Sequence, residues 1–190
     1  MKRSKPSPTN NTLRVIAGSL RHRRFQAVGH RGTRETKDAV KEAIFNALGH
    51  KVYGAHVLDP FAGSGSLIIE AYSRGAKSLK AIEKDPEAFR VMHQNFAYLN
   101  VPVTTIQGDA LAHLRPFQER FDVIFLDPPY DADVLEPMLK LIEQQRLLKD
   151  DGCIIVLHER PFTPPQTFVI VKEKRYGRTR TTTLERKNAR

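Results

Sequence analysis

The sequence VLDPFAGSGSLIIEA, residues 57–71, combines an apolar strand, a loop with two closely spaced glycines and the start of a helix. Gly63 and Gly65 let the backbone pass close to a ligand, and the helix beginning near Gly65 offers unpaired N–H groups. A dinucleotide fingerprint requires a third glycine at position 68, which is Ile68 here. Asp59 ends the strand in the same space, where a carboxylate would repel a pyrophosphate but suit a cation. If this is more than an ordinary strand-to-helix turn, it favours a nucleoside carrying a positive charge over NAD.

Outward from this stretch, strand and helix patterns alternate along the chain. The strand segments are nearly continuous apolar runs, as expected when helices cover both faces of a sheet, and this alternation predicts βαβ units and a parallel sheet. A last segment, 167–186, holds two β-rich runs around Tyr176-Gly177 and predicts a terminal hairpin. The predicted strands are 56–59, 78–83, 103–107, 121–126 and 153–158, and the predicted helices between them are 65–74, 86–99, 110–115 and 133–147.

The chain before residue 55 is predicted as an extension of this core. Residues 13–18 and 23–28 are two short strands joined as a hairpin, and 36–49 is a helix that Thr36 caps and Gly49 ends. Residues 1–12 form a basic tail that we expect to be disordered. We therefore expect one α/β domain over 13–190, with an N-terminal extension at 13–50 and a core at 51–190.

Composition sets limits on location and chemistry. The chain has 190 residues, 40% of them apolar and 27% charged, which suits one globular domain. It lacks an apolar run of the roughly 20 residues that span a bilayer, and its first residues lack the apolar segment of a signal peptide. The single cysteine, Cys153, cannot form an internal disulfide, so the cytoplasm is the expected location. Seven scattered histidines, among them His158, show no metal-binding spacing, and we expect no metal.

Charge is concentrated at the two ends of the chain. Residues 1–50 hold eleven Lys/Arg against three Asp/Glu, and residues 172–190 hold eight against two, whereas residues 51–171 are net acidic. A mildly acidic body with two basic ends predicts a polyanionic partner. The alternative is that the basic ends only keep the protein soluble.

Acidic residues follow successive predicted strands. Glu83 could accept both hydroxyls of a ribose, and Asp109 could accept the amine of an adenine, at the edge where open α/β sheets bind ligands. The alternatives are a surface acid for Glu83 and a helix N-cap for Asp109. With their neighbours, the candidate cofactor-binding residues are Asp59, Phe61, Gly63, Ser64, Gly65, Glu83, Lys84, Asp109, Ala110 and Asp127.

The fourth predicted strand runs into the sequence DPPY, formed by Asp127, Pro128, Pro129 and Tyr130. Two prolines remove two backbone N–H donors, so the segment offers acceptors: the Asp127 carboxylate and carbonyls such as that of Pro128. Acceptors without donors suit an exocyclic amine, whose two N–H bonds they can hold so that its lone pair faces an electrophile. Tyr130 could stack on the base. These four residues are the candidate catalytic residues; the alternative, a turn that closes a strand, explains neither the acid nor the aromatic.

DPFAGSG, Glu83, GDA and DPPY, in this order and spacing, resemble a class I S-adenosylmethionine-dependent methyltransferase acting on an amino nitrogen. This resemblance implies a Rossmann-like sheet of order 3-2-1-4-5-7-6 in which strand 7 alone is antiparallel. It also implies S-adenosylmethionine as cofactor, whose sulfonium accounts for acids where a phosphate-binding loop would avoid them.

A closer resemblance covers nearly the whole chain. RVIAGSLRHRRF (14–25), TRETKDAVKEAIFNAL (33–48) and FLDPPY resemble the bacterial family that methylates the N2 amine of guanine 966 in 16S ribosomal RNA. The chain departs from the usual pattern of that family at His22, Glu35 and Ala39, where glycine, proline and arginine are usual. It keeps Arg14, Gly18, Arg21, Arg23, Thr33, Arg34, Thr36, Asp38, Val40, Glu42, Phe45 and Asn46.

Arginines in the predicted extension form a candidate RNA-binding surface on a fixed element, interleaved with Phe25 and His30. The alternative is a solvated basic face. In the first interpretation, these arginines hold the RNA by its phosphates, and one guanine turns out into the pocket. The candidate RNA-binding residues are Arg14, Arg21, Arg23, Arg24, Arg31 and Arg34.

The function predicted from these features is methylation of a guanine N2 amine in 16S rRNA, by a monomer whose partner is the small ribosomal subunit or its assembly intermediate. One alternative is an adenine-N6 or cytosine-N4 methyltransferase on DNA or other RNA, although 190 residues leave little room for a DNA-reading domain. Another is a non-catalytic RNA-binding assembly factor on the same fold, and a third is an NAD-dependent oxidoreductase.

Overall fold

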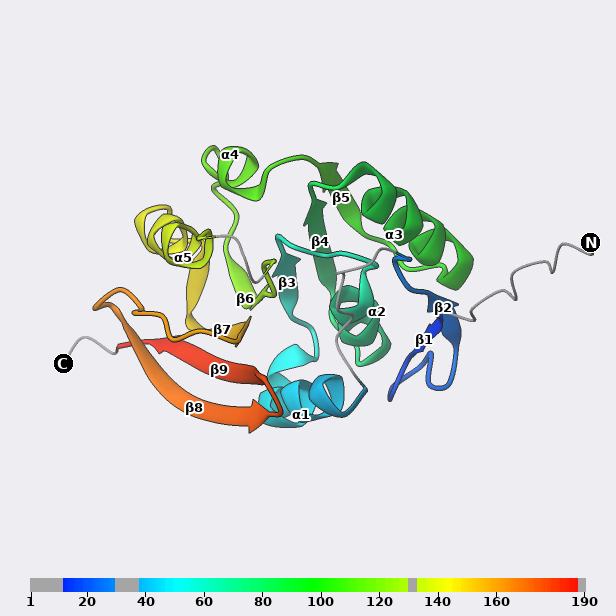
Figure 1. Cartoon of the computed structure of the whole chain (residues 1–190), viewed down its shortest axis with the longest axis horizontal. Coiled ribbons are helices and arrows are strands. Elements are labelled where there is room, and N and C mark those ends of the chain that lie inside the picture. The colour runs from blue at the N-terminus through cyan, green and yellow to red at the C-terminus, as the bar shows by residue number, and fades with distance from the viewer. Residues whose placement is uncertain (1–11, 30–37, 130–132, 188–190) are drawn as a thin grey trace, which may run out of the picture.

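The structure, a computed structural model, describes residues 12–29, 38–129 and 133–187. Within these ranges a seven-stranded sheet has the order β5-β4-β3-β6-β7-β9-β8 (Figure 1). Neighbouring strands from β5 to β7 pair in parallel, whereas β9 is antiparallel to both β7 and β8. The predicted order 3-2-1-4-5-7-6 with an antiparallel seventh strand is confirmed. The strands are β3 (His56–Asp59), β4 (Ser78–Glu83), β5 (Thr104–Gln107), β6 (Phe121–Leu126), β7 (Leu148–His158), β8 (Phe168–Tyr176) and β9 (Thr179–Arg186).

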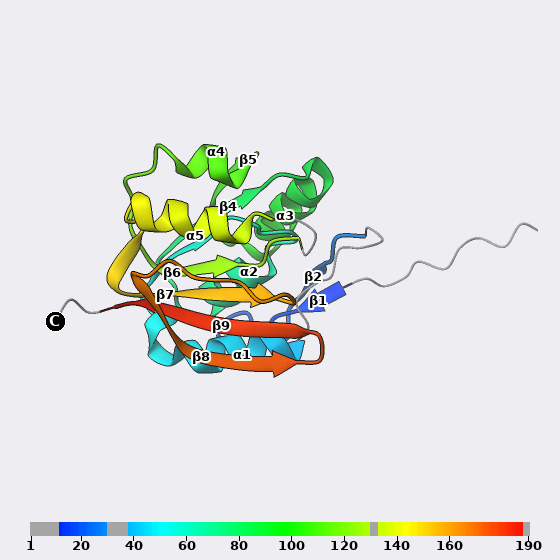
Figure 2. The same cartoon turned by 60° about the vertical axis from the view of Figure 1, so that its left-hand side comes forward.

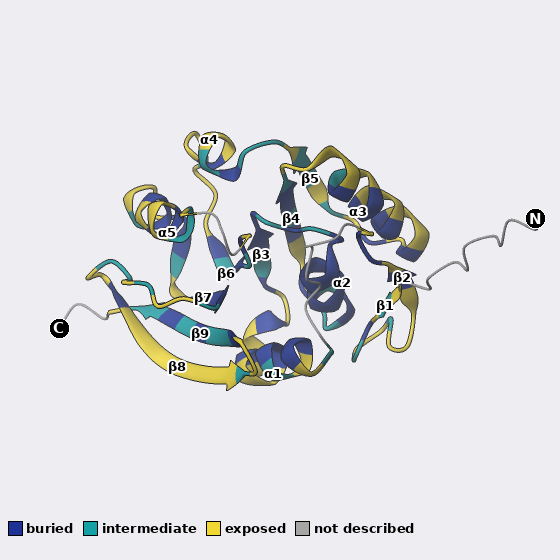
Figure 3. Ribbon diagram, in the orientation of Figure 1, coloured by how far each residue is buried: buried dark blue, intermediate teal, exposed yellow. Residues whose placement is uncertain are grey.

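Helices cover both faces of the sheet, as Figures 1 and 2 show. On one face lie α1 (Asp38–Leu48), α2 (Ser66–Ser73) and α3 (Pro86–Leu99); on the other lie α4 (Ala110–Leu114) and α5 (Leu135–Gln144). Side chains alternate along each strand, so Val57 and Val123 pack under the first three helices while Leu58 and Ile124 pack under the other two. This double burial, visible as dark ribbon along the central strands in Figure 3, explains the continuous apolar strands. No helix in the described ranges has the length and apolarity to cross a membrane.

Several element boundaries differ from those predicted. Helix α1 ends at Leu48, a short 3-10 helix (Gly49–Val52) follows, and Gly49 has a φ of +53°, but the predicted cap Thr36 lies outside the described residues. Helix α5 spans less than the predicted 133–147, and Arg146 beyond it adopts a φ of +52°, which does not continue a right-handed helix. Strand β7 begins at Leu148 rather than 153, since Leu148 already pairs with Phe121.

An N-terminal hairpin packs beside α2 and α3 (Figure 1). Strands β1 (Thr12–Arg14) and β2 (Arg24–Gln26) pair antiparallel, which confirms the hairpin. The prediction that the first strand runs to residue 18 is wrong. The N–H groups of Ile16 and Ala17 donate instead to the carboxylate of Glu70, at 2.9 and 3.0 Å. Glu70 is fully buried on α2 and also pairs with Arg74 at 2.9 Å. Residues 16 and 17 therefore bond to this carboxylate instead of continuing the first strand.

The turn of this hairpin rests on the end of α2. Gly18 has a φ of +86°, and a Cβ there would lie 1.8 Å from the carbonyl oxygen of Ser73. That carbonyl accepts the N–H of Ser19 at 2.7 Å, and the Ser73 hydroxyl accepts the N–H of Leu20 at 2.9 Å. His22 takes a φ of +69°, the left-handed region that glycine adopts most easily. The structure therefore explains why position 18 is a glycine.

Candidate active site at the carboxyl edge of the sheet

Three carboxylates meet at one edge of the sheet because they follow parallel strands. Asp59 ends β3, Glu83 ends β4, and Asp127 follows β6. Asp59 is 1% exposed, and its Oδ1 accepts the N–H of Phe61 at 3.0 Å. Burial, with further contributions from the charges of Asp127 and Glu83, raises the pKa of Asp59 from 3.8 to about 8, against the lowering effect of the Phe61 N–H. Without a nearby cation, Asp59 is therefore protonated at neutral pH.

The two glycines of the 57–71 stretch face different surroundings. A Cβ on Gly65, whose φ is +83°, would lie 2.6 Å from the ring of Phe96 on α3, so this position is closed by packing. Gly63 has a φ of +53°, and a Cβ there would meet nothing within 4 Å among the described residues. The loop thus packs on the protein through Gly65 and leaves the backbone at Gly63 open to a ligand.

Glu83 holds this loop against the end of β4. Its Oε2 accepts the N–H of Gly63 at 2.7 Å and its Oε1 accepts the N–H of Asp85 at 2.8 Å. The Glu83 side chain therefore fixes the loop through two hydrogen bonds and is not simply a solvated surface acid. Each carboxylate oxygen has a second lone pair, so both can still accept a hydroxyl from a ribose.

Asp109 caps helix α4, as one of its two sequence interpretations required. Its Oδ1 accepts the N–H of Ala112 at 3.2 Å, and its Oδ2 pairs with the exposed Lys84 ammonium at 3.2 Å. Lys84 and, after it, the Ala112 N–H lower the pKa of Asp109. Ala110 is buried next to it. A ligand that approaches Asp109 therefore meets an ionised, partly exposed carboxylate already tied to a cation.

Asn95 was not among the predicted site residues, yet it joins the glycine loop to the N-terminal hairpin. It is 2% exposed on α3, and its Nδ2 donates to the carbonyls of Ser64 and Gln26, both at 2.9 Å. Its Oδ1 accepts the N–H of Gln26 at 2.9 Å. The sequence signal for this role is a lone amide at an apolar position of an amphipathic helix.

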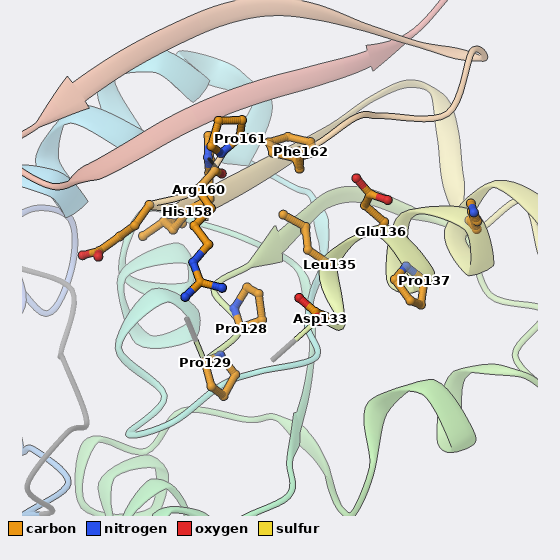
Figure 4. A pocket seen from close by; sticks show the side chains of 13 residues that line it. Pro128, Pro129, Asp133, Leu135, Glu136, Pro137, His158, Arg160, Pro161 and Phe162 are labelled. Carbon is orange, nitrogen blue, oxygen red and sulfur yellow. Dashed lines mark hydrogen bonds between the residues drawn. The ribbon is translucent and has the colours of Figure 1, made fainter. Parts of the chain in front are cut away.

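The DPPY segment borders a cavity of about 480 Å³, a size typical of small-ligand pockets. Pro128 is buried and Pro129 exposed, and both line the cavity, whereas Tyr130 lies outside the described residues. The other walls are formed by segment 157–162, at the end of β7, and by the start of α5 (Figure 4). The acceptor-rich end of β6 therefore opens on a space for a base-sized group.

The N-terminal arginines are exposed on the hairpin and its turn. Arg14 pairs with Asp38 at 2.5 Å, and the guanidinium of Arg23 lies 5.5 Å from the ring centre of Tyr98 on α3. Arg21 and Arg24 are exposed too, whereas Arg31 and Arg34 lie outside the described residues. Three buried side chains tie the hairpin to the helices: Asn95, Glu70 and Lys41, which donates to the Arg14 carbonyl at 2.6 Å. The arginines of the hairpin therefore sit on a fixed surface.

This sheet order and the acids around an open glycine loop at its carboxyl edge define the class I methyltransferase fold. The chain belongs to the family described as Conserved hypothetical protein 95, whose profile matches residues 13–185.

Named relatives agree with this class. The chain is 34% identical over 184 residues to Ribosomal RNA small subunit methyltransferase D of Haemophilus influenzae, covering 93% of this chain and 95% of that protein. It is 38% identical to YlbH of Bacillus subtilis over 175 residues, 88% of this chain and 95% of the relative. Among solved structures, that of yhhF from Escherichia coli superposes with a TM-score of 0.85 at 31% identity, covering 92% and 98% of the two chains.

Proposed function

We propose that the protein transfers a methyl group from S-adenosylmethionine to the N2 amine of a guanine in 16S rRNA, guanine 966 being the nucleotide modified by the family it resembles. The observation that carries the proposal is the segment after β6, where Asp127 precedes two prolines that lack N–H donors and line a cavity. It lies at the same edge of the sheet as Asp59, Glu83 and an open glycine loop. The name of the Haemophilus influenzae relative, a small-subunit rRNA methyltransferase, supports the RNA substrate.

The residues at this edge suit S-adenosylmethionine. Glu83 keeps lone pairs for two ribose hydroxyls, Asp109 can accept the adenine amine, and Gly63 leaves the loop open to the ligand. A positive charge near Asp59 would favour its ionised form and offset the repulsion from Asp127. Phe61, Ser64, Gly65, Lys84 and Ala110 are assigned to the proposed site as neighbours of these residues in the sequence. When bound, the cofactor supplies a methyl group activated by its sulfonium.

Asp127 and the carbonyl of Pro128 would orient the nucleophile. An exocyclic amine is weakly nucleophilic because its lone pair is delocalised into the ring, and two acceptors that hold its N–H bonds direct that lone pair outward. A hydrogen bond to a charged acceptor contributes about 1.5–3 kcal/mol, or roughly one to two decades in rate if it acts in the transition state alone. After the N–C bond forms and the C–S bond breaks, the nitrogen releases its extra proton to Asp127 or water.

The N-terminal extension would hold the RNA. Arg21, Arg23 and Arg24 are exposed on the hairpin, where phosphates can meet cations, and Arg23 lies against the exposed ring of Tyr98, on which a base can stack. With the RNA held there, one guanine turns out of its stack into the cavity beside Pro128. We propose the small subunit or its assembly intermediate as the substrate and a monomeric enzyme in the cytoplasm.

Labelled cofactor tests the substrate. The protein is incubated with methyl-labelled S-adenosylmethionine and, in separate reactions, DNA, bare 16S rRNA and small subunits from cells that lack the modification. We expect label in 16S rRNA on a guanine N2. Label in DNA alone would overturn the RNA assignment, label on adenine would overturn the guanine assignment, and no label in any substrate would favour the non-catalytic assembly factor.

A substitution tests the role of the acid. Asp127→Ala should keep cofactor affinity within about tenfold and lose most turnover, since it removes one of two acceptors for the amine. Asp150→Ala is the matched control, because that exposed carboxylate pairs with Arg120 away from the site. Wild-type turnover in Asp127→Ala would contradict the proposed orientation of the amine.

A further inference from the structure

The wall of the cavity formed by segment 157–162 carries a cation that the proposed reaction has not used. Leu157 and His158 end β7, and Arg160, Pro161 and Phe162 follow them along the cavity. Figure 4 shows the Arg160 side chain extending toward Pro128 and Pro129. A guanidinium therefore lines the same cavity as Pro128 and Pro129.

The backbone at Arg160 is fixed by a buried histidine. His158 is 6% exposed, and its Nδ1 lies 2.8 Å from the carbonyl oxygen of Arg160; since a carbonyl can only accept, Nδ1 carries the proton in this bond. Its Nε2 bonds to the hydroxyl of Thr182 on β9 at 2.8 Å, and its ring meets that of Phe162 edge to face at 4.8 Å. The Arg160 main chain is thereby tied to the sheet rather than left as a free loop.

The guanidinium of Arg160 keeps its donors for a ligand. Among the residues that the structure describes, no side chain forms an ion pair or hydrogen bond with it. The nearby acid Glu136 is engaged by the N–H of Thr163 at 3.1 Å. An arginine that faces a cavity with its planar fork unused suits a partner that presents two acceptors side by side.

Guanine presents such a pair on the edge away from its amine. When N2 points at Asp127 and the Pro128 carbonyl, O6 and N7 lie toward the opposite side of the base, and both are acceptors. The pairing of an arginine fork with O6 and N7 is the commonest specific contact that proteins make to guanine. Adenine, with its own amine placed at Asp127, offers no matching pair of acceptors on the opposite edge.

We infer that Arg160 determines specificity for the target base, by donating to O6 and N7 of the guanine whose N2 amine faces Asp127 and Pro128. This inference rests on the proposed function and adds the recognition of the base to it. The loss of one such bidentate contact lowers the rate by roughly 5- to 150-fold.

Base analogues at the target position test the contact. RNA is prepared with guanine, with 7-deazaguanine, which lacks N7, or with 2-aminopurine, which lacks O6; all three keep the N2 amine. Single-turnover methylation rates are measured for the wild-type protein and for Arg160→Gln. We expect the wild-type protein to prefer guanine over each analogue by about tenfold, and Arg160→Gln to lose most of that preference. Lys140→Ala, which removes another cation lining the cavity, is the control and should retain it.

Each outcome has a defined meaning. Equal wild-type rates on all three RNAs would overturn the role of Arg160, and so would an unchanged preference in Arg160→Gln. If Arg160→Gln slows all three RNAs equally, Arg160 holds a phosphate and the inference is also overturned. Failure of the wild-type protein to methylate guanine in any RNA would instead refute the proposed function. Because Arg160 is exposed, Arg160→Gln should fold, and unchanged cofactor affinity checks that it does.

Discussion

Replacing Asp59 with asparagine should stabilise the cofactor-free protein while weakening its hold on the cofactor. Asparagine keeps the shape of the side chain and an oxygen to accept the Phe61 N–H, which donates at 3.0 Å. It removes a carboxyl group that burial and the charges of Asp127 and Glu83 make costly to ionise. The two effects have opposite signs because a buried carboxylate would stabilise a bound cation but is costly to ionise when no cation is bound.

The size of the effect follows from the raised pKa of Asp59. In the native state that pKa is about 8, against 3.8 for an ordinary aspartate. Above pH 3.8 the unfolded chain has released this proton and the native protein still holds it. The free energy of unfolding therefore falls by about 1.4 kcal/mol per pH unit as pH rises toward 8. At pH 7 the penalty is about 4 kcal/mol, and since burying the amide of the substituted side chain would offset about 1–3 kcal/mol, a net gain of about 1–3 kcal/mol remains.

Urea unfolding of both proteins without cofactor, from pH 5 to pH 7, measures this difference. The stability advantage of Asp59→Asn should grow by about 2–3 kcal/mol across that range, whatever the fixed cost of the amide, because other titrating groups cancel between the two proteins. Calorimetry should also show tighter binding of S-adenosylmethionine to the wild-type protein than to the variant. A stability difference that stays constant with pH would refute the argument that Asp59 is protonated in the native state.

Three further predictions concern the extension and the amide that connects it to the core. Gly18→Ala should lower the free energy of unfolding by more than about 2 kcal/mol in urea titration, whereas Gly29→Ala, whose Cβ would meet none of the described residues within 4 Å, should change it by less than about 0.5 kcal/mol. Arg21→Gln combined with Arg23→Gln should reduce the slope of log affinity against log salt for the RNA by about 1.4–1.8, and an unchanged slope would exclude phosphate contacts there. Asn95→Asp should destabilise the protein by at least about 2 kcal/mol, since the carbonyls of Ser64 and Gln26 both lose their donor and the Ser64 bond is buried, and a wild-type melting temperature would contradict this.

The acids of the site were predictable because they follow parallel strands. Strand ends are marked by apolar runs that stop, so Asp59, Glu83 and Asp127 could be placed at one edge without coordinates. The partners of those acids could not be placed. The bond from Glu83 to the N–H of Gly63 depends on the loop conformation, and the capping bond of Asp109 was one of two roles that its position allowed.

The extension shows where local patterns fail. Residues 15–18 carry a strand-like sequence, yet Glu70, about fifty positions later, takes the N–H groups of Ile16 and Ala17. Nothing within a short window of sequence signals such a bond. The same holds for Asn95, whose position on the apolar face of α3 marks it as unusual but does not say that it reaches both Ser64 and Gln26.

By itself, the sequence determined the layered α/β sheet, its strand order through the resemblance, and the set of acids at its carboxyl edge. These follow from periodicity and from the residues that end each strand, which are local properties of the chain. The tertiary structure alone decided that Gly65 closes on α3 while Gly63 stays open, and that burial raises the pKa of Asp59 to about 8. It also decided that His158 bonds the Arg160 carbonyl at the wall of the cavity that Pro128 lines. Each of these depends on distances between segments remote in sequence, and therefore on how the helices and strands pack.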